Sequence, residues 1–91
     1  MNLITAIKTA KRDVAELSDL PLNSIIGAEF ESESNQWIVN LELVERKGIP
    51  DTMDLIGLYE FRIDDNGETA AFERIGMRKR GDSQVQMSEG Y

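Results

Sequence analysis

The chain has no cysteine and no histidine among its 91 residues. Without cysteine it can form neither a disulfide nor a thiolate metal site, which is typical of proteins in a reducing cell interior. Without histidine it lacks the side chain that most often acts as a general base or metal ligand near neutral pH. We therefore expect a protein that is not an enzyme and that holds no metal and no cofactor.

Long apolar runs are also missing. No stretch approaches the roughly 18–20 residues needed to cross a bilayer, and residues 1–8 lack the basic start and apolar core of a signal peptide. Hydrophobic residues make up 41% of the chain and charged residues 30%, as is usual in globular proteins. The sequence therefore predicts a cytoplasmic protein without membrane contact.

Basic residues are few, since ten Lys and Arg stand against 17 Asp and Glu and give a net charge of −7. Binding to a phosphate backbone needs clustered basic residues, so direct nucleic-acid binding is not expected. The charge is uneven, with a basic block near the C-terminus: Arg74, Arg78, Lys79 and Arg80. An acidic block lies earlier: Glu29, Glu31 and Glu33. This distribution is typical of docking on a charged partner, but charges that protect an edge strand from aggregation would look the same.

The N-terminal part of the chain has the apolar periodicity of a helix. Spacings of three and four predict an amphipathic helix over residues 2–18, which ends before Pro21. Its apolar stripe is Leu3, Ala6, Ile7, Ala10, Val14 and Leu17. We expect the stripe to pack on a sheet, mainly through Leu3, Ile7, Val14 and Leu17.

Alternating apolar and polar residues predict four strands: 24–31, a strand beginning at Trp37, 55–63, and 68–78. One face of the first should carry Ile26, Ala28 and Phe30. One face of the second should carry Trp37, Val39, Leu41 and Leu43, with Asn40, Glu42 and Glu45 toward water. In the third strand Gly57 indicates a bulge or a close neighbour, and the ring of Tyr59 should lie beneath the helix. Residues 64–67, Asp-Asp-Asn-Gly, predict a tight hairpin.

The predicted fold class is α+β, with an N-terminal helix packed on one face of a four-stranded antiparallel meander sheet. Residues 1–80 should form a single domain, and residues 81–91 a flexible C-terminal tail. The second face of the sheet is left open to water or to a partner.

Two acidic clusters have some features of a chemical site. Residues 64–68 contain three carboxylates and an asparagine, but they lack the spacing to a bidentate glutamate that a calcium loop requires, and a hairpin turn explains them. Asp51 and Asp54 flank Thr52 and could form a carboxylate pair for acid–base catalysis, although turn and capping roles are commoner for such residues. Neither cluster predicts an activity.

The connector Ile49-Pro50-Asp51-Thr52 should have a set shape, because proline fixes φ and the polar side chains can bond the nearby backbone. Residues 45–60, ERKGIPDTMDLIGLYE, resemble the gas vesicle protein O family. The resemblance covers roughly residues 37–80: a strand led by Trp37, the IPDT loop, the strand containing Leu58-Tyr59-Glu60, an acidic turn at 64–67 and an arginine-rich last strand.

The resemblance implies an accessory protein of gas vesicle formation that acts in assembly through contacts with the shell protein and other accessory gas vesicle proteins. The residues expected to bind a partner are Ile49, Pro50, Asp51, Thr52, Arg74, Arg78, Lys79 and Arg80. The alternative is a regulator of gas vesicle gene expression, acting directly or through a protein partner. A third is a small-molecule-binding module on the open sheet face. A homo-oligomer is also compatible with the sequence.

Overall fold

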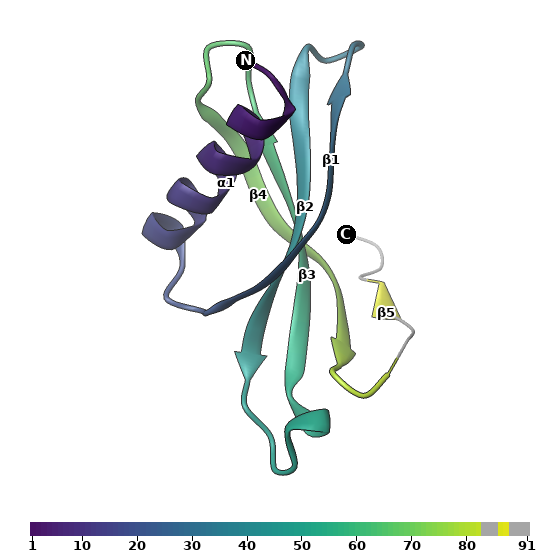
Figure 1. Ribbon diagram of the computed structural model, residues 1–91. Coiled ribbons are helices and arrows are strands. Elements are labelled where there is room, and N and C mark those ends of the chain that lie inside the picture. Colours follow the sequence, from purple (N-terminus) through teal and green to yellow (C-terminus); the bar gives the residue numbers. More distant parts are fainter. Residues whose placement is uncertain (83–85, 88–91) are drawn as a thin grey trace.

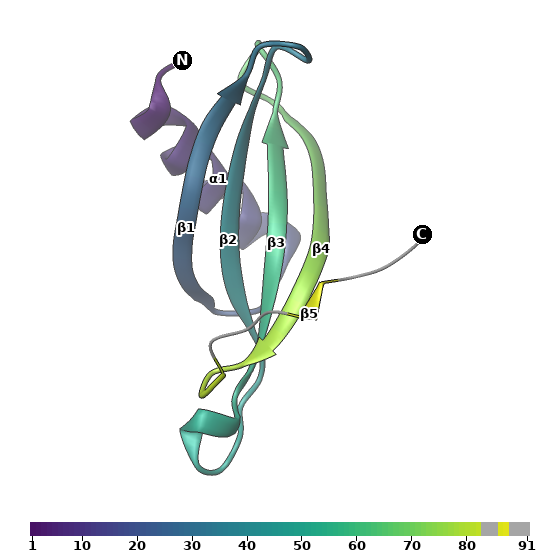
Figure 2. The same ribbon diagram turned by 90° about the vertical axis from the view of Figure 1, so that its right-hand side faces the viewer.

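A computed structural model describes residues 1–82 and 86–87 of the chain. Its elements are α1 (Leu3–Leu17), β1 (Leu22–Glu31), β2 (Gln36–Arg46), the 3-10 helix η1 (Asp51–Met53), β3 (Leu55–Ile63), β4 (Thr69–Lys79) and β5 (Gln86–Met87). The strands pair antiparallel in chain order, β1-β2-β3-β4-β5. Helix α1 lies on one face of the twisted sheet (Figure 1), and Figure 2 views the sheet from the opposite face. The predicted α+β class, with a helix on a four-stranded meander, is confirmed.

Helix α1 begins at an N-cap, Asn2, whose side-chain oxygen accepts a hydrogen bond from the backbone N–H of Thr5 at 2.9 Å, as N-caps commonly do. The residues that α1 buries are Ala6, Thr9, Ala10 and Val14. The expectation that Leu3 and Leu17 cover the sheet is wrong, because both are about half exposed. They lie in the first and last turns of α1, whereas the buried residues lie in its middle turns.

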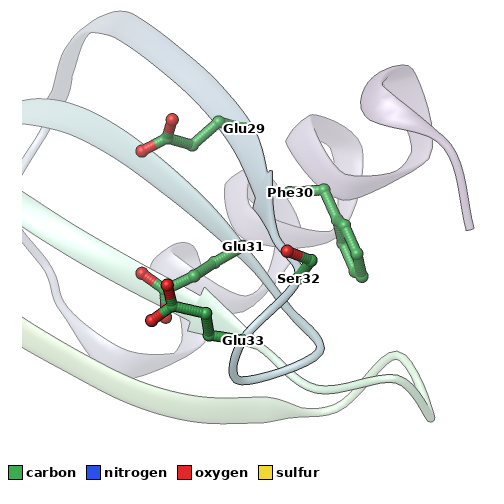
Figure 3. Close-up of a pocket in the computed structure, with 5 residues that line it drawn as sticks. All are labelled: Glu29, Phe30, Glu31, Ser32 and Glu33. Atoms are coloured by element: carbon green, nitrogen blue, oxygen red, sulfur yellow. The ribbon is translucent and has the colours of Figure 1, made fainter.

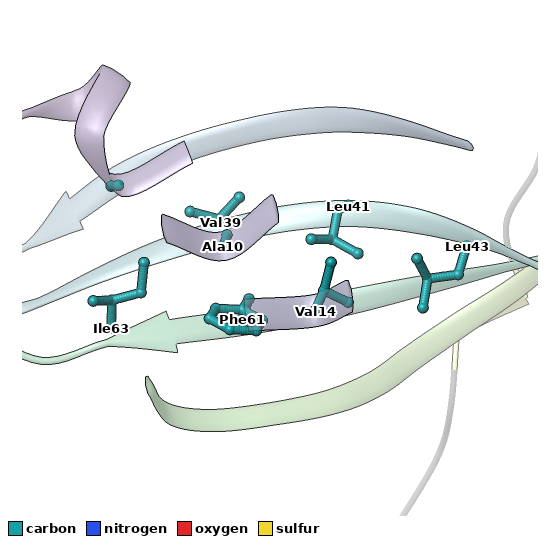
Figure 4. Packing of buried hydrophobic residues seen from close by; sticks show 8 residues of the cluster. Ala10, Val14, Val39, Leu41, Leu43, Phe61 and Ile63 are labelled. Atoms are coloured by element: carbon teal, nitrogen blue, oxygen red, sulfur yellow. The ribbon is translucent and has the colours of Figure 1, made fainter. Parts of the chain in front are cut away.

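The core lies between α1 and the strands β2 and β3. Val39, Leu41 and Leu43 of β2 are fully buried together with Phe61 and Ile63 of β3, and Ala10 and Val14 of α1 lie over them (Figure 4). Partly buried side chains complete the cluster: Leu20, Ile25, Ala28, Trp37, Tyr59 and Phe72. The predicted apolar face of β2 is therefore confirmed, and it is the main surface on which the helix packs.

Strand β1 departs from simple alternation. Its pairing with β2 is irregular between Ile25 and Gly27, and such a bulge reverses which side chains face the core. Ile25 and Ala28 pack against the core, whereas Ile26 is exposed. The prediction that Ile26 shares a face with Ala28 is wrong for this reason.

The turn between β3 and β4 is the predicted hairpin. Asp64 organises it, since its Oδ1 atom accepts hydrogen bonds from the backbone N–H of Asn66 at 2.9 Å and of Glu68 at 3.0 Å. Gly67 adopts a φ of +80°, a value that costs glycine little because it has no Cβ. Asp64 therefore serves as a turn residue.

The short strand β5 was not predicted. Gln86 and Met87 pair with Met77 and Gly76 of β4, so the C-terminal segment returns to the sheet edge. The remainder of the predicted tail, residues 83–85 and 88–91, lies outside the described residues, and the flexibility of residues 81–91 stays a prediction.

In the part of the chain that the structure describes, no helix has both the length and the apolar character needed to cross a membrane.

Candidate functional site

The IPDT loop, residues 49–52, lies at the end of the β2–β3 hairpin, at the bottom of Figure 1. Ile49 is 99% exposed, and Pro50, Asp51 and Thr52 are exposed as well. The peptide bond between Ile49 and Pro50 is cis. One turn of 3-10 helix follows, closed by hydrogen bonds from the Met53 N–H to the Pro50 carbonyl and from the Asp54 N–H to the Asp51 carbonyl, both at 2.9 Å. The loop thus presents an apolar side chain to solvent from an ordered backbone.

Asp54 fixes the base of this loop. It is only 1% exposed, and its carboxylate accepts hydrogen bonds from the Gly48 N–H at 2.7 Å and from Arg80 Nε at 3.1 Å, with Lys47 Nζ at 3.7 Å. The Gly48 hydrogen bond, followed by Arg80 and Lys47, holds the pKa of Asp54 below its ordinary value despite burial. Asp54 therefore has a structural role. Asp51 is exposed and does not belong to this hydrogen-bonded cluster.

Backbone contacts join the loop to the end of β4. The Arg80 N–H donates to the Asp54 carbonyl at 2.8 Å, and the Gly81 N–H donates to the Thr52 carbonyl at 2.9 Å. Gly48 packs so closely that a Cβ there would lie 2.6 Å from the backbone carbon of Met53. The loop is consequently held from both the β2 side and the β4 side.

A second polar cluster lies next to the loop, around Glu42 of β2. Arg78 binds its carboxylate through two hydrogen bonds, Nε to Oε2 at 2.9 Å and Nη2 to Oε1 at 3.0 Å. Asn23 Nδ2 and Ser24 Oγ each donate to Oε1 at 3.1 Å, and Arg80 Nη1 donates to Asn23 Oδ1 at 2.9 Å. The Glu42 and Asp54 clusters are thus joined into one network through Arg80 and Asn23.

Glu42 was expected to face water, and this is wrong, since it is only 4% exposed. It does lie on the sheet face opposite the helix, but Arg78 from β4 covers it and pairs with it. The hydrogen bonds from Arg78, ahead of those from Asn23 and Ser24, lower the pKa of Glu42 although its burial acts in the opposite direction. Arg78 also donates to the Arg80 carbonyl at 3.2 Å, so it shapes the chain that leaves β4.

Arg74 belongs to a third cluster, on the helix side of the sheet. Its Nη1 donates to Glu45 Oε1 at 3.0 Å, and the Tyr59 hydroxyl donates to the same oxygen at 2.7 Å. The Tyr59 ring stacks on Phe72 with centroids 5.0 Å apart and packs against the core. Burial, followed by Glu45, raises the pKa of Tyr59 to about 12. Glu45 was expected to face water, and this too is wrong, because its side chain is only 11% exposed.

The predicted close neighbour of Gly57 is part of this third cluster. A Cβ on Gly57 would lie 2.6 Å from Glu45 Oε1. A side chain at position 57 would have to displace the carboxylate that Arg74 and Tyr59 share, and the prediction of a close neighbour is confirmed.

The structure divides the eight residues predicted to bind a partner into two groups. The IPDT loop and Lys79 are exposed. The three arginines make ion pairs within the molecule, Arg74 with Glu45, Arg78 with Glu42 and Arg80 with Asp54, although Arg74 is exposed as well. Sequence reasoning missed Glu42 and Asp54, because no local pattern shows that their partners come from the end of β4.

The opposite end of the sheet carries a shallow hollow of about 260 Å³, which we call the acidic hollow. It is lined by Glu29, Phe30, Glu31, Ser32 and Glu33. Figure 3 shows the three glutamates on one side of the chain and Phe30 turned to the other. Ser34 and then Arg62, whose Nη1 lies 3.1 Å from Glu31 Oε1, lower the pKa of Glu31. Within residues 1–82 and 86–87, no three acidic side chains converge in a way that could hold a metal ion.

The model of a protein family described as "Gas vesicle synthesis protein GvpO" matches residues 1–84. Gas vesicle protein O of Streptomyces sp. (strain CB03234) is 32% identical over 77 residues, which are 85% of this chain and 59% of that protein. Gas vesicle protein O1 of Halobacterium salinarum is 32% identical over 85 residues, 93% of this chain and 70% of the relative. Gas vesicle protein O of Haloferax mediterranei is 33% identical over 78 residues, which are 86% of this chain and 55% of that protein. The chain thus spans less than two thirds of two of these relatives. No solved structure matches it.

Proposed function

The chain belongs to the gas vesicle protein O family of gas vesicle synthesis proteins, and on this basis we propose that it is a non-enzymatic accessory factor of gas vesicle assembly. It acts through protein–protein contacts with the shell protein and with other accessory gas vesicle proteins. It works in the cytoplasm, where it associates with the growing vesicle. The IPDT loop is its docking element.

The observation that carries this proposal is the exposure of Ile49, 99%, on a loop with a fixed backbone. A large apolar side chain held in water gains free energy when a partner covers it, about 25 cal/mol for each Å² of apolar surface buried. The hydrogen bonds of Asp54 and Gly81 already order the loop, so binding costs little conformational entropy. A preformed apolar tip of this kind is suited to insertion into a pocket on another protein.

Fewer charged residues near the loop are available for docking than the sequence suggested. Lys79 is exposed and lies at the base of the loop, where it pairs with Leu55 of β3. Arg78 and Arg80 act indirectly, because their bonds to Glu42 and Asp54 hold the loop and the end of β4 together. The proposed contact surface is therefore Ile49 with Pro50, Asp51 and Thr52, flanked by Lys79.

Affinity capture from vesicle-forming cells tests this function. The bait proteins are the wild type, Ile49→Asp and the control Ile4→Asp, which changes an exposed isoleucine of α1 instead. The wild type and Ile4→Asp should retain gas vesicle shell and accessory proteins, whereas Ile49→Asp should lose them while keeping the wild-type circular dichroism spectrum. Equal capture by Ile49→Asp would contradict docking through the loop. Capture of RNA polymerase or a promoter-binding protein in place of gas vesicle proteins would favour a regulatory role.

A further inference from the structure

The two ends of β2 carry complementary surfaces that one molecule cannot bring together. Strand β2, Gln36–Arg46, begins beside the acidic hollow and ends beside the IPDT loop. Its 11 residues span about 35 Å at roughly 3.3 Å per residue, and the molecule is 42 Å long. Figures 1 and 2 show the β1–β2 turn, beside which the hollow lies, and the IPDT loop at opposite ends of the sheet. Any contact between them must therefore join two molecules.

The loop end has an apolar centre with basic residues around it. Ile49 projects into solvent, and three exposed basic residues surround the base of the loop: Arg46, Lys47 and Lys79. Arg46 and Lys79 both pair with Leu55 at the start of β3, which places them on the two strands that flank β3. Two exposed acids also lie at this end, Asp51 on the loop and Asp82 next to Lys79, whereas Asp54 is already paired with Arg80 and Lys47. This end is thus locally basic on a chain whose net charge is −7.

The hollow end has the opposite charge and an exposed aromatic ring. Glu29, Glu31 and Glu33 line the hollow, and Arg62 compensates only part of their charge through Glu31. Phe30 is 46% exposed beside Trp37, with ring centroids 5.3 Å apart. The hollow, about 260 Å³, is smaller than the roughly 300–1,000 Å³ of typical small-molecule sites. Its size therefore favours a protein side chain over a small ligand.

We propose that the IPDT loop of one copy binds the acidic hollow of a second copy, head to tail. The proposal rests on the docking role of the loop and names a partner for it. Arg46, Lys47 and Lys79 of one copy approach the glutamates of the next, and Ile49 packs on Phe30, across the edge strand β1 from those glutamates. Because the two contacting surfaces differ, the contact is heterologous, and repetition produces a chain of copies with a free loop at one end.

The proposed contact between two copies is small and weak, which is compatible with transient association. A loop tip in a shallow hollow buries less area than the roughly 1,200 Å² below which interfaces are usually weak. The net charge of −7 on each copy also opposes association at long range. Complementary charge at the two ends therefore mainly determines the orientation in which copies meet.

Sedimentation equilibrium of the purified protein at increasing concentration tests the proposal. The mean mass of the wild type should rise above that of a 10.3 kDa monomer as the concentration approaches about 1 mM, the range of weak contacts. Ile49→Asp should stay monomeric, as should Glu29→Lys with Glu33→Lys. The controls are Leu17→Asp and Glu16→Lys with Asp19→Lys, which introduce the same charges at exposed positions at and just beyond the C-terminal end of α1, and they should associate like the wild type. A monomeric wild type, or association by either blocked variant, would overturn the proposal.

Mixing the two blocked variants tests the head-to-tail geometry. Ile49→Asp keeps a working hollow and the Glu29→Lys, Glu33→Lys variant keeps a working loop, so an equimolar mixture should form dimers and nothing larger. A mixture that stays monomeric, or that grows beyond dimers, would contradict the geometry. Capture of gas vesicle proteins is measured separately in cells. If it depends on Ile49 while the pure wild type is monomeric, the docking function stands and self-association fails.

Discussion

Arg78 is the residue on which the polar contacts beside the IPDT loop most depend. It satisfies both oxygens of the buried Glu42 carboxylate, and a buried charge without its partner is strongly destabilising. We expect Arg78→Ala to lower the free energy of unfolding by roughly 2–4 kcal/mol, measured by urea denaturation at pH 7. The neighbouring, exposed Lys79→Ala should change it by less than about 0.5 kcal/mol. Equal effects of the two substitutions would show that Glu42 is not held by Arg78.

The same pair gives a pH dependence of known sign. Because the pKa of Glu42 lies below its ordinary value of 4.5 in the folded state, its contribution to stability is complete above that value and is lost as the pH falls through the lowered pKa. Without Arg78, burial favours the protonated carboxyl instead. The difference in stability between the wild type and Arg78→Ala should therefore shrink as the pH is lowered from 7 to about 3.

Tyr59 offers a test at high pH. Burial and the bond to Glu45 raise its pKa to about 12 from 10.0, so its contribution to stability is complete below pH 10 and is lost as the pH rises toward 12. An ultraviolet titration of a Tyr91→Phe background, which leaves one tyrosine in the chain, should show ionisation near 12. Glu45→Gln should bring the value closer to 10. A titration near 10 in the background protein would contradict the contact with Glu45.

At the level of single residues, the sequence predicts the core better than the polar networks. Alternation correctly assigned Val39, Leu41 and Leu43 to the covered face. It also assigned Glu42 to the opposite face but could not show that a side chain would cover it. Arg78 lies 36 positions away along the chain and Arg80 lies 26 positions from Asp54, and such long-range partners depend on the register of β4.

At the level of elements, the hairpin that carries the IPDT loop depends on a glycine at its base. A Cβ on Gly48 would lie 2.6 Å from the backbone carbon of Met53, whereas one on Gly27 of β1 would meet nothing within 4 Å. Gly48→Ala should lower stability by about 1–3 kcal/mol, as overpacking usually does, and should speed hydrogen exchange of the backbone amides at positions 48 and 81. Gly27→Ala, the matched control, should stay within about 1 kcal/mol of the wild type. If both variants behave alike in thermal unfolding, the loop is not held as described.

Periodicity predicted where the elements lie but not their irregularities. The helix was expected over residues 2–18 and runs over Leu3–Leu17, and the Asp-Asn-Gly signal correctly placed the β3–β4 turn. The bulge at Ile26 could not be predicted, because an extra residue in β1 leaves no local signature and is detected only against β2. The resemblance of residues 45–60 to a known family identified the IPDT loop as a site, but only the structure gives its exposure and the bonds that hold it.

At the level of the whole molecule, the chain is an elongated sheet with a function proposed for each end. Helix α1 covers one face and completes the core, while the IPDT loop and the β1–β2 turn, beside which the acidic hollow lies, are at opposite ends of the sheet (Figure 2). The network of Glu42, Asp54, Arg78 and Arg80 joins the base of the loop to the end of β4. This division explains how the loop can be rigid and exposed at once, and why changes at Ile49 should affect binding while leaving the fold intact.

The most direct test is complementation in vesicle-forming cells that lack their own copy of this protein. Vesicles are counted by electron microscopy, and gas vesicle transcripts and the amount of each variant are measured in the same cells. The wild type and Ile4→Asp should restore vesicles, whereas Ile49→Asp should accumulate normally, leave transcript levels unchanged and fail to restore them. Full restoration of vesicles by Ile49→Asp would contradict assembly through the IPDT loop.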